Sequence, residues 1–113
     1  MSHYADPTDS KYTKVYKEQT PAMLKAFIDF DQAVFASEGP ELSLKVRQLI
    51  AVAVAITTQC PYCIEAHTKD ALAAGATEAE IAESAWVSTA IRAGGGYTHG
   101  RMALKFADHE HTA

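Results

Sequence analysis

The chain has 113 residues, of which 48% are hydrophobic and 21% charged, and its formal net charge is −4. This length suits one domain, and the composition is that of a folded protein rather than a disordered chain. Basic residues are few and scattered, so we expect no nucleic-acid partner. The longest apolar run, 49–56, is too short to span a membrane, and the N-terminus resembles no export signal. We therefore expect no membrane association and a cytoplasmic location.

The first third of the chain predicts an arm followed by a helix. Residues 1–19 are polar and lack clean periodicity, so we expect an extended arm or a weak helix near 11–18. Thr20 and Pro21 mark a helix start, and apolar residues then recur at helical spacing up to the break at 39–40. This spacing predicts a helix with a buried face. The apolar residues are Met23, Phe27, Phe30 and Val34.

Residues 41–57 predict a second helix, although the pattern leaves a strand open. The segment 49–58 alternates with period two and is rich in β-branched residues, as a strand would be. The choice between helix and strand decides the fold class. For the helix, one expected buried stripe is wide enough for deep burial. It comprises Leu42, Val46, Leu49 and Ala53, with Ile50, Val54 and Thr57 beside it.

The rest of the chain predicts three further helices. A short helix starts from Cys60, with Pro61 in its first turn, and runs to Gly75, a natural C-terminal glycine. The segment 77–80 has the form of a capping box and opens an alanine-rich helix that we expect to stop at the glycines 94–96. A final helix is expected over 97–108.

The whole pattern predicts an all-α chain without internal repeats. Its expected organisation is an N-terminal arm over 1–19, a helical domain over 20–109 and a frayed tail over 110–113. Phe27 and Trp86 are interpreted as core or subunit-interface residues.

Cys60 and Cys63 are the only cysteines, and His67 follows four residues after the second one. At a helix start, cysteines three residues apart lie on one side and can close into a disulfide, while the helix N-terminus favours the thiolate. His67 lies one turn further along the same face, where its imidazole can serve Cys63 as a base or proton shuttle. The spacing therefore predicts a redox site.

Other interpretations of the cysteine pair remain open. A glutaredoxin-like enzyme also carries such a pair after an apolar run, but it needs a cis-proline loop further on, and all four prolines lie at or before this motif. A structural zinc site needs a fourth ligand besides Cys60, Cys63 and His67, which His99 or a carboxylate would have to supply. We favour a surface or capping role for His99. A buried, redox-inert pair is the remaining alternative.

Around the motif the chain is LIAVAVA over 49–55, CPYCIEAHT over 60–68 and ALAAGATEAEI over 71–81. This pattern resembles the AhpD-like, or carboxymuconolactone decarboxylase, family over roughly residues 20–105. The resemblance implies an all-α AhpD-like helical domain in which a helical hairpin presents the CxxC at the N-terminus of a helix. It also implies a homo-oligomer, either a trimer or a hexamer.

The resemblance further implies a thiol peroxidase. Cys63 would be the peroxidatic thiol, Cys60 would resolve it as a redox disulfide, and His67 would relay the proton. The expected partners are a hydroperoxide substrate and a dithiol reductant protein, such as a lipoylated one, with no cofactor and no metal. The alternatives are a lactone decarboxylase, which is not expected to need the cysteines, and a redox-sensing or metal-binding module.

One position departs from the family pattern. The family has a glutamate twelve residues before the first cysteine, and this chain has Gln48 there. A glutamine accepts a hydrogen bond from imidazole but cannot take a proton or neutralise imidazolium. We therefore expect an altered relay, with Glu41 as a substitute at longer reach and Glu65 solvated on the far side of its helix. The substitution Gln48→Glu is expected to raise the peroxidase rate near neutral pH.

Overall fold

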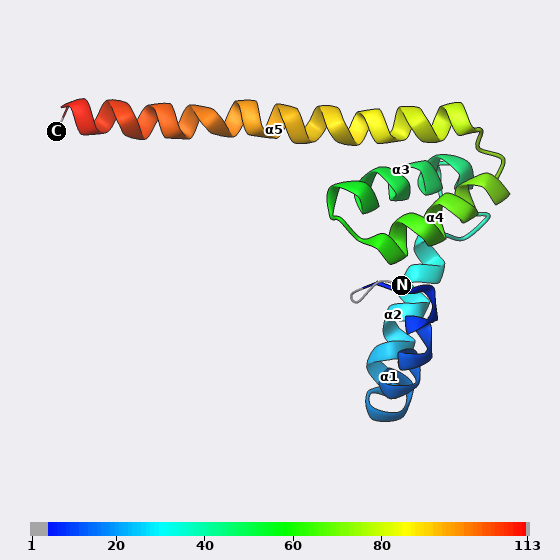
Figure 1. The fold of residues 1–113 in the computed structure, drawn as a ribbon. Coiled ribbons are helices and arrows are strands. Elements are labelled where there is room, and N and C mark those ends of the chain that lie inside the picture. Colours follow the sequence, from blue (N-terminus) through cyan, green and yellow to red (C-terminus); the bar gives the residue numbers. More distant parts are fainter. Residues whose placement is uncertain (1–4, 113) are drawn as a thin grey trace.

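A computed structural model describes the backbone of residues 5–112 and the side chains of residues 5–108. This part of the chain is all-α and contains no strand, which confirms the predicted fold class (Figure 1). The strand alternative for 49–58 is wrong, because one helix runs through this segment to Thr57. The elements are the 3-10 helix η1 (Pro7–Tyr12), α1 (Thr13–Gln19), α2 (Pro21–Val34), α3 (Leu44–Thr57), α4 (Pro61–Ala73) and α5 (Glu78–Thr112).

The N-terminal arm is helical from Pro7 rather than extended. Asp6 caps η1, because its carboxylate accepts a hydrogen bond from the backbone N–H of Thr8 at 2.9 Å. The next helix, α2, begins at Pro21 as predicted but ends at Val34, short of the glycine–proline break.

The predicted buried face of α2 is wrong within this chain. Met23, Phe27 and Phe30 are 74%, 62% and 66% exposed. The reason is that α2 packs along the short α1, which leaves the apolar face of α2 uncovered. The core interpretation of Phe27 is therefore also wrong, and an interface role remains a prediction.

Helix α3 carries the buried centre of the chain, but on a different face from the predicted one. It begins at Leu44 because the Ser43 hydroxyl accepts a hydrogen bond from the backbone N–H of Val46. Its buried residues are Gln48, Val52 and Ala55. Because α3 is apolar around most of its circumference, periodicity alone could not select the face that packs. Four members of the expected stripe are exposed: Leu42, Val46, Ile50 and Val54.

Helices α3 and α4 form a hairpin around a small core. Val52, Ala71 and Ala76 are buried there, and Leu49, Ile56 and Ile81 pack against them. After α4, Gly75 has φ of 97°, a left-handed conformation that glycine adopts without strain. The predicted capping box follows: the Thr77 N–H donates to Glu80 at 2.9 Å, and the Glu80 N–H donates to Thr77 at 3.1 Å.

Helix α5 is one continuous helix of 35 residues. The predicted stop at 94–96, the separate helix over 97–108 and the frayed tail from 110 are wrong, because the backbone stays helical to Thr112. A helical glycine costs about 1 kcal/mol relative to alanine, which weakens a helix without breaking it. In Figure 1 the first half of α5 lies along α3, and the second half projects away from the rest of the chain.

The protein is extended for its size. Its radius of gyration is 19.2 Å, whereas a compact chain of this length would have about 13 Å. Trp86, predicted as a core or interface residue, is 71% exposed on α5, so the core interpretation is wrong. Within the described residues, no helix is both long and apolar enough to cross a membrane.

Candidate functional site

The turn between α3 and α4 places both cysteines at the start of α4. Cys60 is the N-cap residue with extended backbone, and Pro61 follows in the first turn. The two cysteines are joined by a disulfide, with their Cα atoms 5.3 Å apart. The backbone N–H of Cys63 donates a hydrogen bond to the Cys60 sulfur at 3.3 Å. This N–H is one of the first of the helix, which have no partner within the helix, and it points at the Cys60 sulfur. The arrangement stabilises a thiolate once the disulfide is reduced.

His67 lies one turn after Cys63 on α4 and meets α3 through a hydrogen bond. Its Nδ1 lies 2.8 Å from the side-chain oxygen of Gln48, which is only 4% exposed. With an oxygen facing the ring, Nδ1 donates, so the neutral imidazole keeps its basic lone pair on Nε2. The position that departs from the family pattern is therefore in direct contact with the predicted relay histidine.

Phe35, which sequence reasoning missed, also contacts His67. Its ring centroid lies 4.8 Å from that of the imidazole, with the planes inclined by 32°. Phe35 directly follows α2, and nothing in its sequence neighbourhood distinguishes it from an ordinary helix-end aromatic. Arg47 was also missed. Its guanidinium donates to the carbonyls of Val34 and Ala36, on either side of Phe35, whereas sequence alone indicates a solvated side chain at this position of α3.

Tyr62, inside the CxxC motif, ties the N-terminal arm to the start of α4. Its hydroxyl donates to the Asp9 carboxylate at 2.5 Å. This hydrogen bond, with a smaller contribution from burial, raises the pKa of Tyr62 above its usual value. Asp9 of η1 therefore lies beside the start of α4, the helix that carries the cysteines.

Three other residues considered from the sequence are exposed at the surface. His99 is exposed in the interior of α5, which confirms the predicted surface position, whereas a capping role is wrong because no helix starts there. Glu41 is exposed in the loop before α3, and Glu65 pairs with Lys69 at 3.0 Å. Among the described residues, no cluster of three or more His, Cys, Asp or Glu side chains has a geometry that could hold a metal ion.

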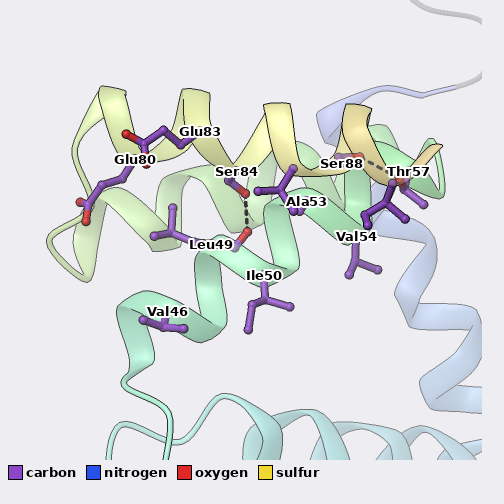
Figure 2. Close-up of a pocket in the computed structure, with 12 residues that line it drawn as sticks. Val46, Leu49, Ile50, Ala53, Val54, Thr57, Glu80, Glu83, Ser84 and Ser88 are labelled. Carbon is purple, nitrogen blue, oxygen red and sulfur yellow. Dashed lines mark hydrogen bonds between the residues drawn. The ribbon is translucent and has the colours of Figure 1, made fainter. Parts of the chain in front are cut away.

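A groove of about 520 Å³ lies on the opposite face of α3 from Gln48, between α3 and the first half of α5. Figure 2 shows the hydrogen bonds that join its walls. The Ser84 hydroxyl donates to the Leu49 carbonyl at 2.6 Å, and the hydroxyls of Ser88 and Thr57 are 2.7 Å apart. Much of the expected buried stripe of α3 lines this groove. Its lining is Val46, Leu49, Ile50, Ala53, Val54, Thr57, Glu80, Glu83, Ser84, Val87, Ser88 and Ile91.

The chain is similar to several known bacterial proteins. It is 47% identical over 83 residues to "Uncharacterized protein 4 in cox locus" of Paracoccus denitrificans, a match that covers 74% of this chain and 73% of the relative. It is 46% identical over 88 residues to a protein of Haemophilus influenzae, covering 78% of this chain and 76% of the relative.

The chain is also similar to a solved structure and matches a family model. The crystal structure of a protein from Methanobacterium thermoautotrophicum has a TM-score of 0.70 and 33% identity, and the match covers 78% of this chain and 97% of that one. The model of the carboxymuconolactone decarboxylase family matches residues 21–106, which include the disulfide, His67 and Gln48. The chain therefore belongs to the carboxymuconolactone decarboxylase family.

Proposed function

We propose that this chain is a cytoplasmic thiol-dependent peroxidase, an antioxidant protein of the alkyl hydroperoxide reductase type. One observation carries the proposal: a disulfide at the start of α4 has, one turn later, a histidine whose Nδ1 is fixed by a buried side-chain oxygen. A closed CxxC at a helix N-terminus provides a two-electron couple, and the fixed histidine provides a base.

The first step is the reduction of the peroxide by Cys63. The Nε2 atom of His67 takes the thiol proton, and the thiolate attacks the outer oxygen of the hydroperoxide. The O–O bond breaks, the sulfur is oxidised to a sulfenic acid, and the alcohol leaves with the proton that His67 returns. We assign this role to Cys63 because His67 is one turn away on the same face of α4.

Cys60 completes the oxidative half-reaction. The Cys60 thiol gives up its proton, the thiolate attacks the sulfenic sulfur of Cys63, and the S–O bond breaks. The disulfide forms, and the hydroxide leaves as water with the proton that the thiol released. The hydrogen bond from the Cys63 N–H supports this role, since it favours the nucleophilic thiolate of Cys60. A dithiol reductant protein, such as a lipoylated one, then restores both thiols by exchange and is itself oxidised to a disulfide. No cofactor or metal takes part in this scheme.

The decisive experiment uses the fully reduced protein and one equivalent of an organic hydroperoxide. We expect rapid peroxide loss and conversion of both thiols to a disulfide. The intact mass of the protein and a count of its free thiols measure this conversion. Cys63→Ser should abolish peroxide reduction, whereas Cys60→Ser should stop at a sulfenic acid that dimedone traps. Full activity in both variants, or surviving peroxide with the wild type, would overturn the proposal.

Gln48 gives a second test of the same scheme. Gln48→Glu would place a carboxylate within hydrogen-bond distance of His67 and stabilise the imidazolium that forms during proton transfer. We expect a faster peroxide reaction near neutral pH. An unchanged rate would place position 48 outside the proton relay.

Other activities would give different results in these assays. A lactone decarboxylase would keep its activity in both cysteine variants. A redox-sensing or metal-binding module would exchange its disulfide or bind stoichiometric zinc without consuming peroxide. Neither has a specific observation in its favour, because the feature that stands out at this site is the disulfide with its histidine.

We further propose that the chain works as a homo-oligomer, a trimer or a hexamer. Its accessible surface is 8984 Å², whereas a compact monomer of this mass would expose about 6,100 Å². The excess of about 2,900 Å² per chain is well above the roughly 800 Å² that each partner buries in a standard interface. A large apolar contact with further copies would account for this excess.

We place this contact on α5, because the helix carries two stripes of apolar and small residues at three- and four-residue spacing. The inner stripe begins against α3, which covers it only as far as Ser88. The outer stripe faces away from α3 along its whole length, and Trp86, Tyr97 and Leu104 are over 70% exposed on it. The inner stripe is Ser84, Ser88, Ile91, Gly95, Thr98, Met102 and Phe106, and the outer stripe is Trp86, Ala90, Ala93, Tyr97, Gly100 and Leu104.

A further inference from the structure

The imidazole of His67 is held at one edge and on one face by residues from different parts of the chain. At its edge, Nδ1 bonds to Gln48 from α3. On its face lies the ring of Phe35, from the loop that follows α2, with the ring centroids 4.8 Å apart. The edge contact selects the tautomer, whereas the face contact limits rotation of the ring about its side-chain bonds. The face contact depends on what fixes Phe35, which is a loop residue.

Arg47 fixes the backbone on both sides of Phe35. Its Nη1 donates to the carbonyl of Val34 at 2.7 Å, and its Nη2 donates to the carbonyl of Ala36 at 2.6 Å. Its Nε also donates to the carbonyl of Leu42, at the far end of the same loop, at 3.0 Å. The planar guanidinium is suited to this task because its five N–H donors form a rigid fork.

Arg47 and Gln48 are neighbours in the first half of α3, so one short stretch of helix controls both contacts of the imidazole. We propose that Arg47 is a positioning residue, which clamps Phe35 onto the His67 ring and so keeps Nε2 oriented for Cys63. The role of Nε2 toward Cys63 rests on the proposed function, but the clamp itself is defined by Arg47, Phe35 and His67 alone.

The clamp is tested first by NMR, with no peroxide present. An aromatic ring over the imidazole shifts the His67 Cε1–H resonance upfield. We expect this shift to be lost in Phe35→Leu, which keeps an apolar side chain, and kept in Phe35→Tyr, which keeps the ring. Arg47→Lys should lose most of it, because a single ammonium cannot span three carbonyls.

A matched control is Arg92 of α5. It donates to the carbonyl of Thr57, on α3, at 2.6 Å, so Arg92→Lys makes the same exchange of arginine for lysine at a carbonyl of this helix but leaves Phe35 untouched. We expect a wild-type His67 resonance in that variant. If Arg47→Lys keeps the upfield shift, or if Arg92→Lys loses it equally, the clamp is wrong. Phe35→Leu provides the same comparison if Arg47→Lys does not fold.

The second readout is the rate at which iodoacetamide alkylates Cys63 in the reduced Cys60→Ser background, measured across pH. We expect Arg47→Lys and Phe35→Leu to slow alkylation several-fold near neutral pH and to displace the pH profile, while Phe35→Tyr and Arg92→Lys leave it unchanged. Identical profiles in all variants would overturn the positioning role. Because alkylation needs no peroxide, a displaced profile in a protein without peroxidase activity would retain this inference and reject the proposed function.

Discussion

The α3–α4 hairpin and the second half of α5 are both helical, yet only the hairpin makes the contacts that explain its structure. In the hairpin, Val52 and Ala71 are 1% and 0% exposed, and the turn between the helices ends in a disulfide. Beyond Ile91, α5 leaves its apolar side chains in solvent, and Met102, Leu104 and Phe106 are 52%, 73% and 59% exposed. The same chain thus contains one region with a buried core and one without.

The difference in burial separates the residues that form the candidate site from the residues available for assembly. The disulfide, His67, Gln48 and Phe35 all come from 35–67 of one chain, so the contacts of the imidazole form without another copy. Helix α5 contributes to this region only through its first half, which covers the other side of α3. Substitutions in the two regions should therefore affect stability and assembly separately.

The largest effect is expected inside the hairpin. Val52→Asp buries a carboxylate without a partner and should cost on the order of 3 kcal/mol or more, a large share of a typical domain's stability. The control is Val15→Asp on α1, where the valine is 56% exposed and the same change should have little effect. Urea unfolding followed by circular dichroism compares them. Equal midpoints for the two variants would show that the hairpin core does not carry the stability of the chain.

The next effect concerns the outer stripe of α5. Leu104→Glu puts a charge on the last apolar side chain of the outer stripe, which is 73% exposed, and should convert the assembly to monomers, as measured by light scattering during gel filtration. His99→Glu is the control, since it adds one negative charge at an exposed position of α5 between the two stripes. An unchanged mass for Leu104→Glu would exclude the outer stripe from the interface. The hairpin should retain its disulfide chemistry in both variants.

A smaller effect is expected at Gly95, on the inner stripe. Gly95→Ala should stabilise the monomeric Leu104→Glu variant but weaken the wild-type assembly. A Cβ there meets nothing within 4 Å in this chain, so Gly95→Ala in the monomeric Leu104→Glu background should stabilise α5 by about 0.5–1 kcal/mol. In the wild-type background the added methyl should instead weaken the assembly, because glycine permits close approach of a partner helix. Gly96→Ala, off both stripes, should stabilise α5 in both backgrounds. Thermal unfolding with gel filtration distinguishes these cases.

The same division explains which parts of the fold were predictable from sequence. Pro21, Pro61, Gly75 and the capping box 77–80 act within a few residues, so they marked the correct helix boundaries. The glycines 94–96 misled because their local cost does not by itself end a helix. The buried face of α3 was also misjudged, since an almost wholly apolar helix takes its buried side from its neighbours.

For the candidate site, the sequence predicted the residues that share one helix and missed the contact residue that comes from a distant loop. Cys60, Cys63 and His67 share α4, and their spacing is visible in the sequence. Gln48 was found through the family pattern, and its contact with His67 is direct. Phe35 lies 32 residues before His67, in a loop held by Arg47 through backbone carbonyls. Bonds to carbonyls place no demand on residue type at the accepting positions, so no sequence signal marks them.

The smallest effect is expected where the first turn of α5 meets the hairpin. Lys45 of α3 and Glu80 of α5 form an ion pair at 2.9 Å, and Glu80 also accepts the Thr77 N–H. The hydrogen bond from Lys45, followed by that from Thr77, lowers the pKa of Glu80 below its usual value. The unfolded chain therefore binds the proton more readily, so this contribution is present at neutral pH and is lost as the pH falls through the folded-state pKa.

Glu80→Gln keeps the acceptor for Thr77 and removes the charge, so the loss of stability between pH 7 and acid should be smaller than in the wild type. Glu78→Gln removes an equal charge from the same helix turn but leaves the ion pair with Lys45 intact. Urea midpoints at both pH values compare the variants. Since the pair is partly exposed and screened by solvent, the difference should be small and should shrink further in high salt. A pH dependence in Glu80→Gln equal to that of the wild type would show that the contact between α3 and α5 depends on the serine bonds and apolar packing alone.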